Sequence, residues 1–282
     1  MRLQIENEKL RAEIESFGAE LKSLVRKGDN QEYLWEADPA FWGKTSPILF
    51  PFIGKLANLE YCYQGKSYTA DKHGFARDMD YRVTVQEKDR IVLSIESTEE
   101  TLAKYPFPFA LEVEYRLEGN SLSEQWRVHN QGSETMYFSI GGHPAFACPL
   151  VKNGTREGKR TDCFVKLYGA EDKGMIQSTE IDVSVGLLSG RIFPVTLKEG
   201  IFPIVEHIFD SDALVFAEQG VTGAALLDHE GREYIRMEAP SCPVWGICDS
   251  KDYRGTLEER PYTNQAEPGE IWEDGFRIIV GE

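Results

Sequence analysis

Two histidines of the chain have neighbours that suit acid or base chemistry. His143 follows two glycines and precedes Pro144, and His73 stands before another glycine in the segment 71–77. Glycine allows unusual backbone angles or the close approach of a ligand, and proline fixes φ and removes a hydrogen-bond donor. An imidazole can give or take a proton near neutral pH. From its neighbours alone, His143 suits a catalytic site and a tight turn equally well.

A carboxylate would complete an acid and base pair, and the chain offers many. Glu258 and Glu259 lie in a charged segment before Pro261, but the chain has 47 acidic side chains in all. Nothing local distinguishes Glu258 from Glu259, Glu267 or Glu270. A solvated loop is the simpler explanation of the segment, so the residues alone do not identify a base.

The sequence lacks the motifs of several ligand classes. Gly65-Lys66-Ser67 is not the end of a phosphate loop, because Glu60 occupies the position of the first glycine. There is no G-x-G-x-x-G, no zinc-ligand spacing and no H-E-x-x-H. We therefore expect neither a metal ion nor a cofactor.

The charge balance narrows the possible partners. The chain carries 31 basic and 47 acidic side chains, a net charge of −16. This balance argues against binding to nucleic acid or to an anionic membrane, whereas a neutral sugar would not be repelled. No apolar run approaches the roughly 20 residues of a membrane helix. Five cysteines without a C-x-x-C motif indicate free thiols and a cytoplasmic protein.

Alternation of apolar and polar residues, typical of half-buried strands, runs through most of the chain. It is clearest over residues 81–95, 109–128, 225–237 and 276–280, with polar turns between. Ser97 with Glu100 forms a capping-box pattern for a short helix that Pro106 ends. Short strands joined by polar turns favour an antiparallel sandwich or barrel, and the absence of a linker favours one domain over residues 1–282.

The first 25 residues carry two conflicting patterns. Their apolar residues follow the four-three spacing of an amphipathic helix at Leu10, Ile14, Phe17, Leu21 and Leu24. The same segment also reads as two alternating strands on either side of Gly18. Local signals slightly favour the helix.

Several segments, in this order, resemble the aldose 1-epimerase (galactose mutarotase) family, most closely its shorter bacterial branch. The resemblance covers nearly the whole chain. The most specific motifs are His73-Gly74-Phe75-Ala76-Arg77 and Gly142-His143-Pro144-Ala145-Phe146, about 70 residues apart. Further agreement lies in residues 20–24, 32–35, 47–54, 209–214 and 268–270. The resemblance implies an all-β, mostly antiparallel β-supersandwich with few short helices, and hence strands rather than a helix over residues 3–25.

The resemblance also implies interconversion of the α and β anomers of a free aldose. A base takes the proton of the C1 hydroxyl while an acid protonates the ring oxygen, and the ring opens and recloses on the other face. Carried over residue by residue, Glu258 is the base, His143 the acid, His73 a ligand of the ring oxygen or a neighbouring hydroxyl, and Asp212 an acceptor for sugar hydroxyls.

This chain departs from the family pattern at two positions. Lys55 stands where an arginine usually joins the site, which keeps the charge but loses the planar fork; Arg77 could compensate for it. Glu258 is followed by Glu259 rather than by Pro-Trp, so Glu259 is the alternative base. Neighbouring residues of a strand face opposite sides, and only one of the two can point into the cleft.

Three alternative functions remain open. The chain could bind sugars without efficient turnover, or act as a hexose-phosphate 1-epimerase if Lys55 and Arg77 form a basic cluster. A glycosidase ranks last, because the sequence offers no identifiable pair of carboxylates. Trp35, Trp42 and Trp126 could line a sugar platform or pack in the core. We expect a small sugar as substrate, no nucleic acid or membrane partner, and a monomer or homodimer.

Overall fold

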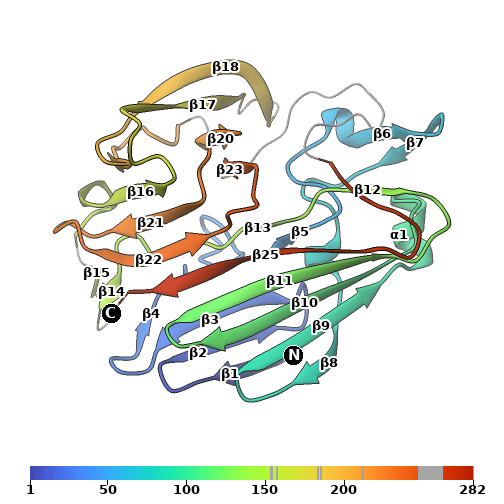
Figure 1. The fold of residues 1–282 in the computed structure, drawn as a ribbon, viewed down its shortest axis with the longest axis horizontal. Helices are drawn as coiled ribbons and strands as arrows, with labels where there is room; N and C mark the ends of the chain where they lie inside the picture. The colour runs from blue at the N-terminus through green and yellow to red at the C-terminus, as the bar shows by residue number, and fades with distance from the viewer. Residues whose placement is uncertain are drawn as a thin grey trace.

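The computed structural model describes residues 1–152, 155–156, 158–182, 184, 186–210, 213–246 and 263–281. Antiparallel strands make up most of this part of the chain (Figure 1). The largest sheet has the strand order β19-β16-β21-β22-β25-β11-β10-β9-β8. Its strands are β8 (Arg82–Gln86), β9 (Arg90–Glu96), β10 (Phe109–Glu118), β11 (Ser121–Asn130), β16 (Phe164–Tyr168), β19 (Ile201–Pro203), β21 (Gly223–Leu227), β22 (Glu233–Glu238) and β25 (Ile271–Val280). The alternating segments of the sequence are thus strands, and the all-β expectation is confirmed.

The N-terminal residues form a second sheet, which settles the conflict between helix and strand. Its strands are β1 (Arg2–Glu6), β2 (Leu10–Glu15), β3 (Glu20–Arg26) and β4 (Gln31–Glu32), paired in that order. The strands that the family resemblance implies over residues 3–25 are confirmed, and the helix that the local pattern favours is wrong. The register of the strands explains the misleading pattern. Pairing shifts between Glu13 and Ile14, so Ile14 faces Leu21 while Glu13 faces Ser23. This bulge places Leu21 and Leu24, three residues apart, on the same buried side.

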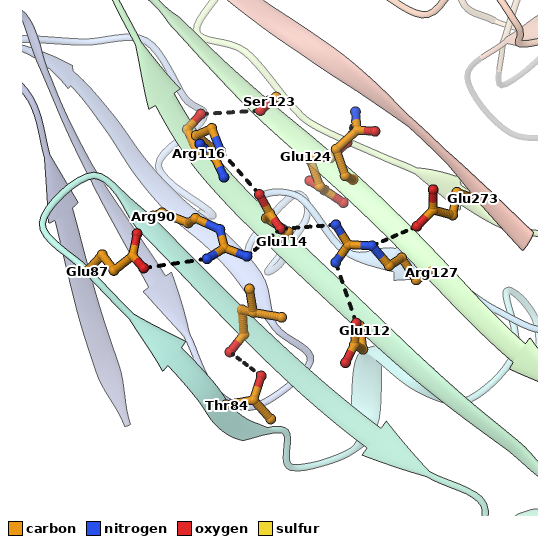
Figure 2. A network of polar contacts seen from close by, with 12 residues as sticks. Thr84, Glu87, Arg90, Glu112, Glu114, Arg116, Ser123, Glu124, Arg127 and Glu273 are labelled. Carbon is orange, nitrogen blue, oxygen red and sulfur yellow. Dashed lines mark hydrogen bonds and ion pairs between the residues drawn. The ribbon is translucent and has the colours of Figure 1, made fainter. Parts of the chain in front are cut away.

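The core lies between these two sheets, and Figure 1 shows the blue strands β1–β3 lying against the teal strand β9 and the green strands β10 and β11. Odd-numbered residues of β10 from Phe109 to Leu117 point inward and are at most 3% exposed. The opposite face of the same strands carries a network of ion pairs, drawn in Figure 2. At its centre Glu114 contacts three arginines, Arg90, Arg116 and Arg127. This outward face is therefore charged, and the inward face is almost entirely apolar.

A smaller four-stranded sheet has the order β18-β17-β20-β23. It consists of β17 (Met175–Asp182), β18 (Leu187–Thr196), β20 (Val215–Ala217) and β23 (Val244–Gly246). Apolar residues of this sheet and of β16 form a second cluster, and Trp245 packs against both this cluster and the main core. Trp245 thus links the two parts of the molecule.

The remaining elements are short. They are β5 (Ile48–Leu49), β6 (Glu60–Tyr63), β7 (Lys66–Thr69), β12 (Met136–Phe138), β13 (Gly141–Gly142), β14 (Val151–Lys152), β15 (Thr155–Arg156), β24 (Asn264–Ala266), η1 (Ala57–Leu59), η2 (Ala76–Asp78), η3 (Arg160–Asp162) and α1 (Glu99–Lys104). Helix α1 is where the sequence predicts it, but Thr98, not Ser97, caps it, through a capping box with Thr101. None of the helices in the described part of the chain has the length and apolar character that a membrane span requires.

Candidate functional site

The segment 47–55 is the scaffold of the candidate site, because both motif histidines are attached to its backbone. On one side, β5 pairs with β13, and the N–H of His143 donates to the carbonyl of Pro47 over 3.1 Å. On the other side, the N–H of His73 donates to the carbonyl of Gly54 over 2.7 Å. Two motifs about 70 residues apart in the sequence thereby meet across one short stretch of chain.

The two glycines before His143 are explained by packing. A Cβ atom on Gly142 would lie 2.3 Å from Cε1 of Phe276 in β25, and one on Gly141 would lie 3.0 Å from Cδ1 of Ile53. Neither glycine has a positive φ. Their role is therefore to admit neighbouring side chains, which fixes β13, the short strand directly before His143, against the large sheet.

The backbone at His73 has a left-handed conformation, with φ of 67° at His73 and 69° at Gly74. A Cβ on Gly74 would come within 2.1 Å of the carbonyl oxygen of Phe50, so only glycine fits there. The same carbonyl accepts hydrogen bonds from the N–H groups of Phe75 and Ala76, at 3.0 and 3.2 Å. The turn is thus fixed by its contacts with the scaffold segment, and a left-handed histidine is held in it.

The imidazole of His73 is fixed in one chemical form. It is 5% exposed, and its Nδ1 accepts a hydrogen bond from the backbone N–H of Gly54 over 3.0 Å. Burial, together with the positive charges of Arg77 and Lys72, lowers the pKa of His73 to about 3. At neutral pH the ring is therefore uncharged and carries its single hydrogen on Nε2, which leaves Nε2–H as a hydrogen-bond donor.

The structure brings His73 and His143 together. Their ring centroids are 6.1 Å apart, and the rings are nearly perpendicular, at 81°. His143 is half-buried and also contacts the indole of Trp42, with centroids 4.9 Å apart. The pair therefore offers one neutral donor and one more accessible imidazole side by side, a combination that suits hydrogen bonding and proton transfer to a polar substrate.

The two basic candidates lie in different settings. Lys55 directly follows Gly54, is half-buried, and extends so that its Cδ lies 3.6 Å from the position of a Cβ on Gly186, in the turn between β17 and β18. The guanidinium of Arg77 donates to the carbonyl of Lys72 over 2.9 Å and lies 3.5 Å from a carboxylate oxygen of Asp78. Arg77 thus fastens its own loop, while its charge still acts on His73.

Three predicted site residues, Asp212, Glu258 and Glu259, lie outside the described residues. The flanking strands are described: β23 ends at Gly246, and β24 begins at Asn264, which faces Phe138 of β12. Within the described residues, no three His, Cys, Asp or Glu side chains gather in a way that could hold a metal ion.

Glu20 contributes to this region without a signal of its own in the sequence, and two of the three tryptophans that the sequence singles out, Trp35 and Trp42, also lie here. The carboxylate of Glu20, 5% exposed, accepts hydrogen bonds from the backbone N–H groups of Thr45 and Ser46 and so fixes the start of the scaffold segment. Trp42 contacts His143, and Trp35 donates from Nε1 to the carbonyl of Trp42 over 3.0 Å. Only the pairing of distant segments reveals these contacts.

The comparisons with known proteins agree on one family. Residues 1–161 match the sequence profile of the family described as Aldose 1-epimerase. Protein LacX, plasmid, of Lactococcus lactis subsp. lactis is 37% identical over 283 residues, covering 97% of this chain and 92% of LacX.

Two solved structures are similar over their whole length. A galactose mutarotase related enzyme from Lactobacillus acidophilus has a TM-score of 0.87 and 29% identity, with 100% of this chain and 98% of that chain covered. A galactose mutarotase-like protein from Lactobacillus casei has a TM-score of 0.88 and 26% identity, with 100% of both chains covered. Together with the β-rich fold and the two histidine motifs, these similarities show that the chain belongs to the aldose 1-epimerase family.

Proposed function

We propose that this protein is an aldose 1-epimerase, which interconverts the α and β anomers of a free aldose by opening and closing the sugar ring. The observation that carries the proposal is the pair of adjacent imidazoles in different environments. His73 is buried and neutral, whereas His143 is half-buried at a centroid distance of 6.1 Å. The similarity to a galactose mutarotase related enzyme supports the same reaction.

The environments of the two histidines support different roles for them. A ring with a pKa of about 3 does not carry a second proton at neutral pH, so His73 serves as a fixed Nε2–H donor to the ring oxygen or a neighbouring hydroxyl. The proton that the ring oxygen needs comes instead from His143, the more accessible of the two. This division follows from burial and from the Gly54 N–H, not from the histidines themselves.

The family resemblance supplies the two remaining parts of the proposal, the base and the acceptor for sugar hydroxyls. Glu258 takes the proton of the C1 hydroxyl, Glu259 is the alternative base, and Asp212 accepts hydrogen bonds from sugar hydroxyls. Lys55, next to the Gly54 that orients His73, replaces the usual arginine as a donor. Reclosure of the ring reverses the roles of acid and base, so the cycle requires no net proton uptake.

Polarimetry tests this reaction directly. Freshly dissolved α-glucose or α-galactose is followed with and without the protein, and the wild type is expected to accelerate mutarotation. His143→Asn and Glu258→Gln are each expected to lower the rate by about 10²-fold or more, because a positioned acid or base contributes ~10²–10⁴-fold. Glu259→Gln is the matched control for Glu258. Sugar binding without any acceleration would instead support a binding protein of the same fold.

A phosphorylated aldose is the second candidate substrate. Arg77 and Lys72 both lower the pKa of His73 through their positive charge, so at least two cations act on the site. Parallel assays with glucose and glucose 6-phosphate distinguish the substrates. A preference for the phosphate that falls in Lys55→Met would support this candidate, and equal or better turnover of glucose would exclude it.

The thiols support a cytoplasmic setting for the proposed function. Cys62, Cys148, Cys163 and Cys242, the cysteines in the described part of the chain, are free thiols, which supports a reducing compartment such as the cytoplasm. There the protein would act on a small sugar as a monomer or homodimer, without nucleic-acid or membrane partners. Size-exclusion chromatography with light scattering measures the oligomeric state.

A further inference from the structure

The proposed acid, His143, contacts an aromatic side chain for which the reaction itself gives no role. The indole of Trp42 lies with its centroid 4.9 Å from that of the imidazole, with the two planes tilted by 43°. The ring of His73 approaches the same imidazole from another direction, nearly edge-on at 6.1 Å and 81°. The imidazole of His143 is therefore restricted by two rings that come from different segments of the chain.

Trp42 is itself held firmly by its own turn. The turn begins at Asp38, whose Oδ1 accepts the N–H of Ala40 over 2.9 Å and whose carbonyl accepts the N–H of Trp42 over 2.9 Å. The carbonyl of Trp42 in turn accepts the Nε1–H of Trp35 over 3.0 Å. Both backbone groups of Trp42 are thus engaged, and the indole is presented from a fixed position.

A further hydrogen bond connects Trp35 to the backbone of the segment that contains His143. The backbone N–H of Trp35 donates to the carbonyl of Ala145 over 2.9 Å, two residues beyond His143. The side chain of Trp35 then fixes Trp42, and the indole of Trp42 contacts His143. A displacement of Trp42 relative to His143 would have to break one of these links.

Core packing does not account for Trp42. Trp126 is 6% exposed and belongs to the main core, whereas Trp35 and Trp42 are half-buried and belong to none of the buried apolar clusters. The bulky indole thus contributes little to the core, and its ring contact is made with a motif histidine.

We propose that Trp42 is a positioning residue that holds the imidazole of His143 in the orientation required for proton transfer to the sugar ring. The proposal rests on the proposed function, in which His143 is the acid. A histidine side chain has two free torsions, and proton transfer requires one nitrogen within hydrogen-bond reach of the substrate oxygen. Packing of the indole against the imidazole restricts these torsions before the substrate binds, so the imidazole is preorganised in the folded protein.

The kinetic test compares three substitutions at Trp42. Trp42→Ala and Trp42→Leu remove the aromatic contact and are expected to lower kcat by about 10-fold or more, with KM changed less than about threefold, because only part of the ~10²–10⁴-fold effect of a positioned acid is lost. Trp42→Phe keeps an aromatic ring against the imidazole and is expected to recover most of kcat. A purely structural role would lower the melting temperature of all three without separating Phe from Leu.

The matched control is Phe41→Ala in the same turn. Phe41 is 82% exposed, and its ring meets Trp35 edge-on with centroids 6.4 Å apart. Its loss is expected to leave kcat within about twofold of wild type. Trp35→Phe removes the Nε1 donor to Trp42 and is expected to lower kcat in the same direction as Trp42→Ala, by a smaller factor.

A readout independent of turnover comes from NMR of the imidazole. The Hε1 and Hδ2 signals of His143, assigned with His143→Asn, are expected to shift and broaden in Trp42→Ala, because the indole ring current is lost and the imidazole samples more orientations. Unchanged signals, or a kcat in Trp42→Ala equal to wild type, would overturn the proposal. Full turnover in His143→Asn would reject His143 as the acid, and with it the catalytic role of Trp42.

Discussion

Glu124 is a carboxylate in the centre of the core, and its replacement by glutamine should change how stability depends on pH. The residue lies in β11, is 0% exposed, and points into the sandwich, away from the charged outer face that Figure 2 shows around Glu114. Its Oε1 accepts a hydrogen bond from Nε1 of Trp126 over 2.8 Å. Its Oε2 meets no hydrogen-bond partner among the described residues.

Burial raises the pKa of Glu124 from 4.5 to about 8, and the N–H of Trp126 and the hydroxyl of Tyr115 offset this only in part. Between these two values the folded protein keeps a proton that the unfolded chain has released. Folding therefore becomes less favourable as the pH rises through this window, by about 1.4 kcal/mol for each pH unit at full effect. From pH 5 to pH 8 the loss attributable to Glu124 amounts to about 3 kcal/mol.

Glu124→Gln removes the titration and retains the oxygen that accepts from Trp126. Unfolding in urea at pH 5, 6, 7 and 8 gives the free energy of unfolding of both proteins, and their difference cancels the titration of all other groups. Between pH 5 and pH 8 the free energy of unfolding of the variant should rise relative to that of the wild type by about 3 kcal/mol, most steeply near pH 6 to 7. A difference that stays constant over this range, with equal m values, would show that Glu124 is ionised in the folded protein and would refute the reasoning.

Two further substitutions test other parts of the structure. Gly142→Ala places a Cβ 2.3 Å from the ring of Phe276, so we expect the free energy of unfolding to fall by about 1–3 kcal/mol in urea unfolding. Because the added methyl group also displaces His143, we expect the rate of mutarotation measured by polarimetry to fall as well. Glu114 titrates in the opposite sense to Glu124: hydrogen bonds from Arg90, and then from Arg127 and Arg116, lower its pKa from 4.5 to about 2. The stability that ionised Glu114 contributes is complete above pH 4.5 and is lost as the pH falls toward 2. In thermal melts from pH 2 to pH 5, the melting temperature of Glu114→Gln should therefore fall less with decreasing pH than that of the wild type. An equal fall in both proteins would contradict this.

The strands were predictable because their signal is local. In β10, alternate residues from Phe109 to Leu117 are buried, as the period of two requires. The N-terminal region misled the same reasoning because a bulge in β3, where Lys22 has no partner opposite Glu13 and Ile14, changes the count of residues by one. A bulge depends on the partner strand, and no window along one segment can contain it.

The candidate site was predictable as a set of motifs but not as a geometry. The glycines before His143 signal a close approach, yet the atom that approaches is Cε1 of Phe276, more than a hundred residues further along the chain. The form of His73 depends on the N–H of Gly54, and the setting of His143 depends on Trp42. Each of these partners is an ordinary residue in its own neighbourhood, so its role emerges only when the sheets assemble.

The arrangement explains how two identical side chains come to have different chemical properties. His73 sits in a left-handed turn that closes against the scaffold segment, and this burial, with its Nδ1 occupied, leaves it as a neutral donor. His143 directly follows the short strand β13 on the other side of the same segment and stays half-buried beside Trp42. Because the backbone of one segment sets both positions, a change that moves it should alter the settings of His73 and His143 together. The difference between the two imidazoles therefore depends on the rigidity of residues 47–55, and the buried carboxylate of Glu20 contributes to that rigidity by anchoring Thr45 and Ser46 directly before the segment.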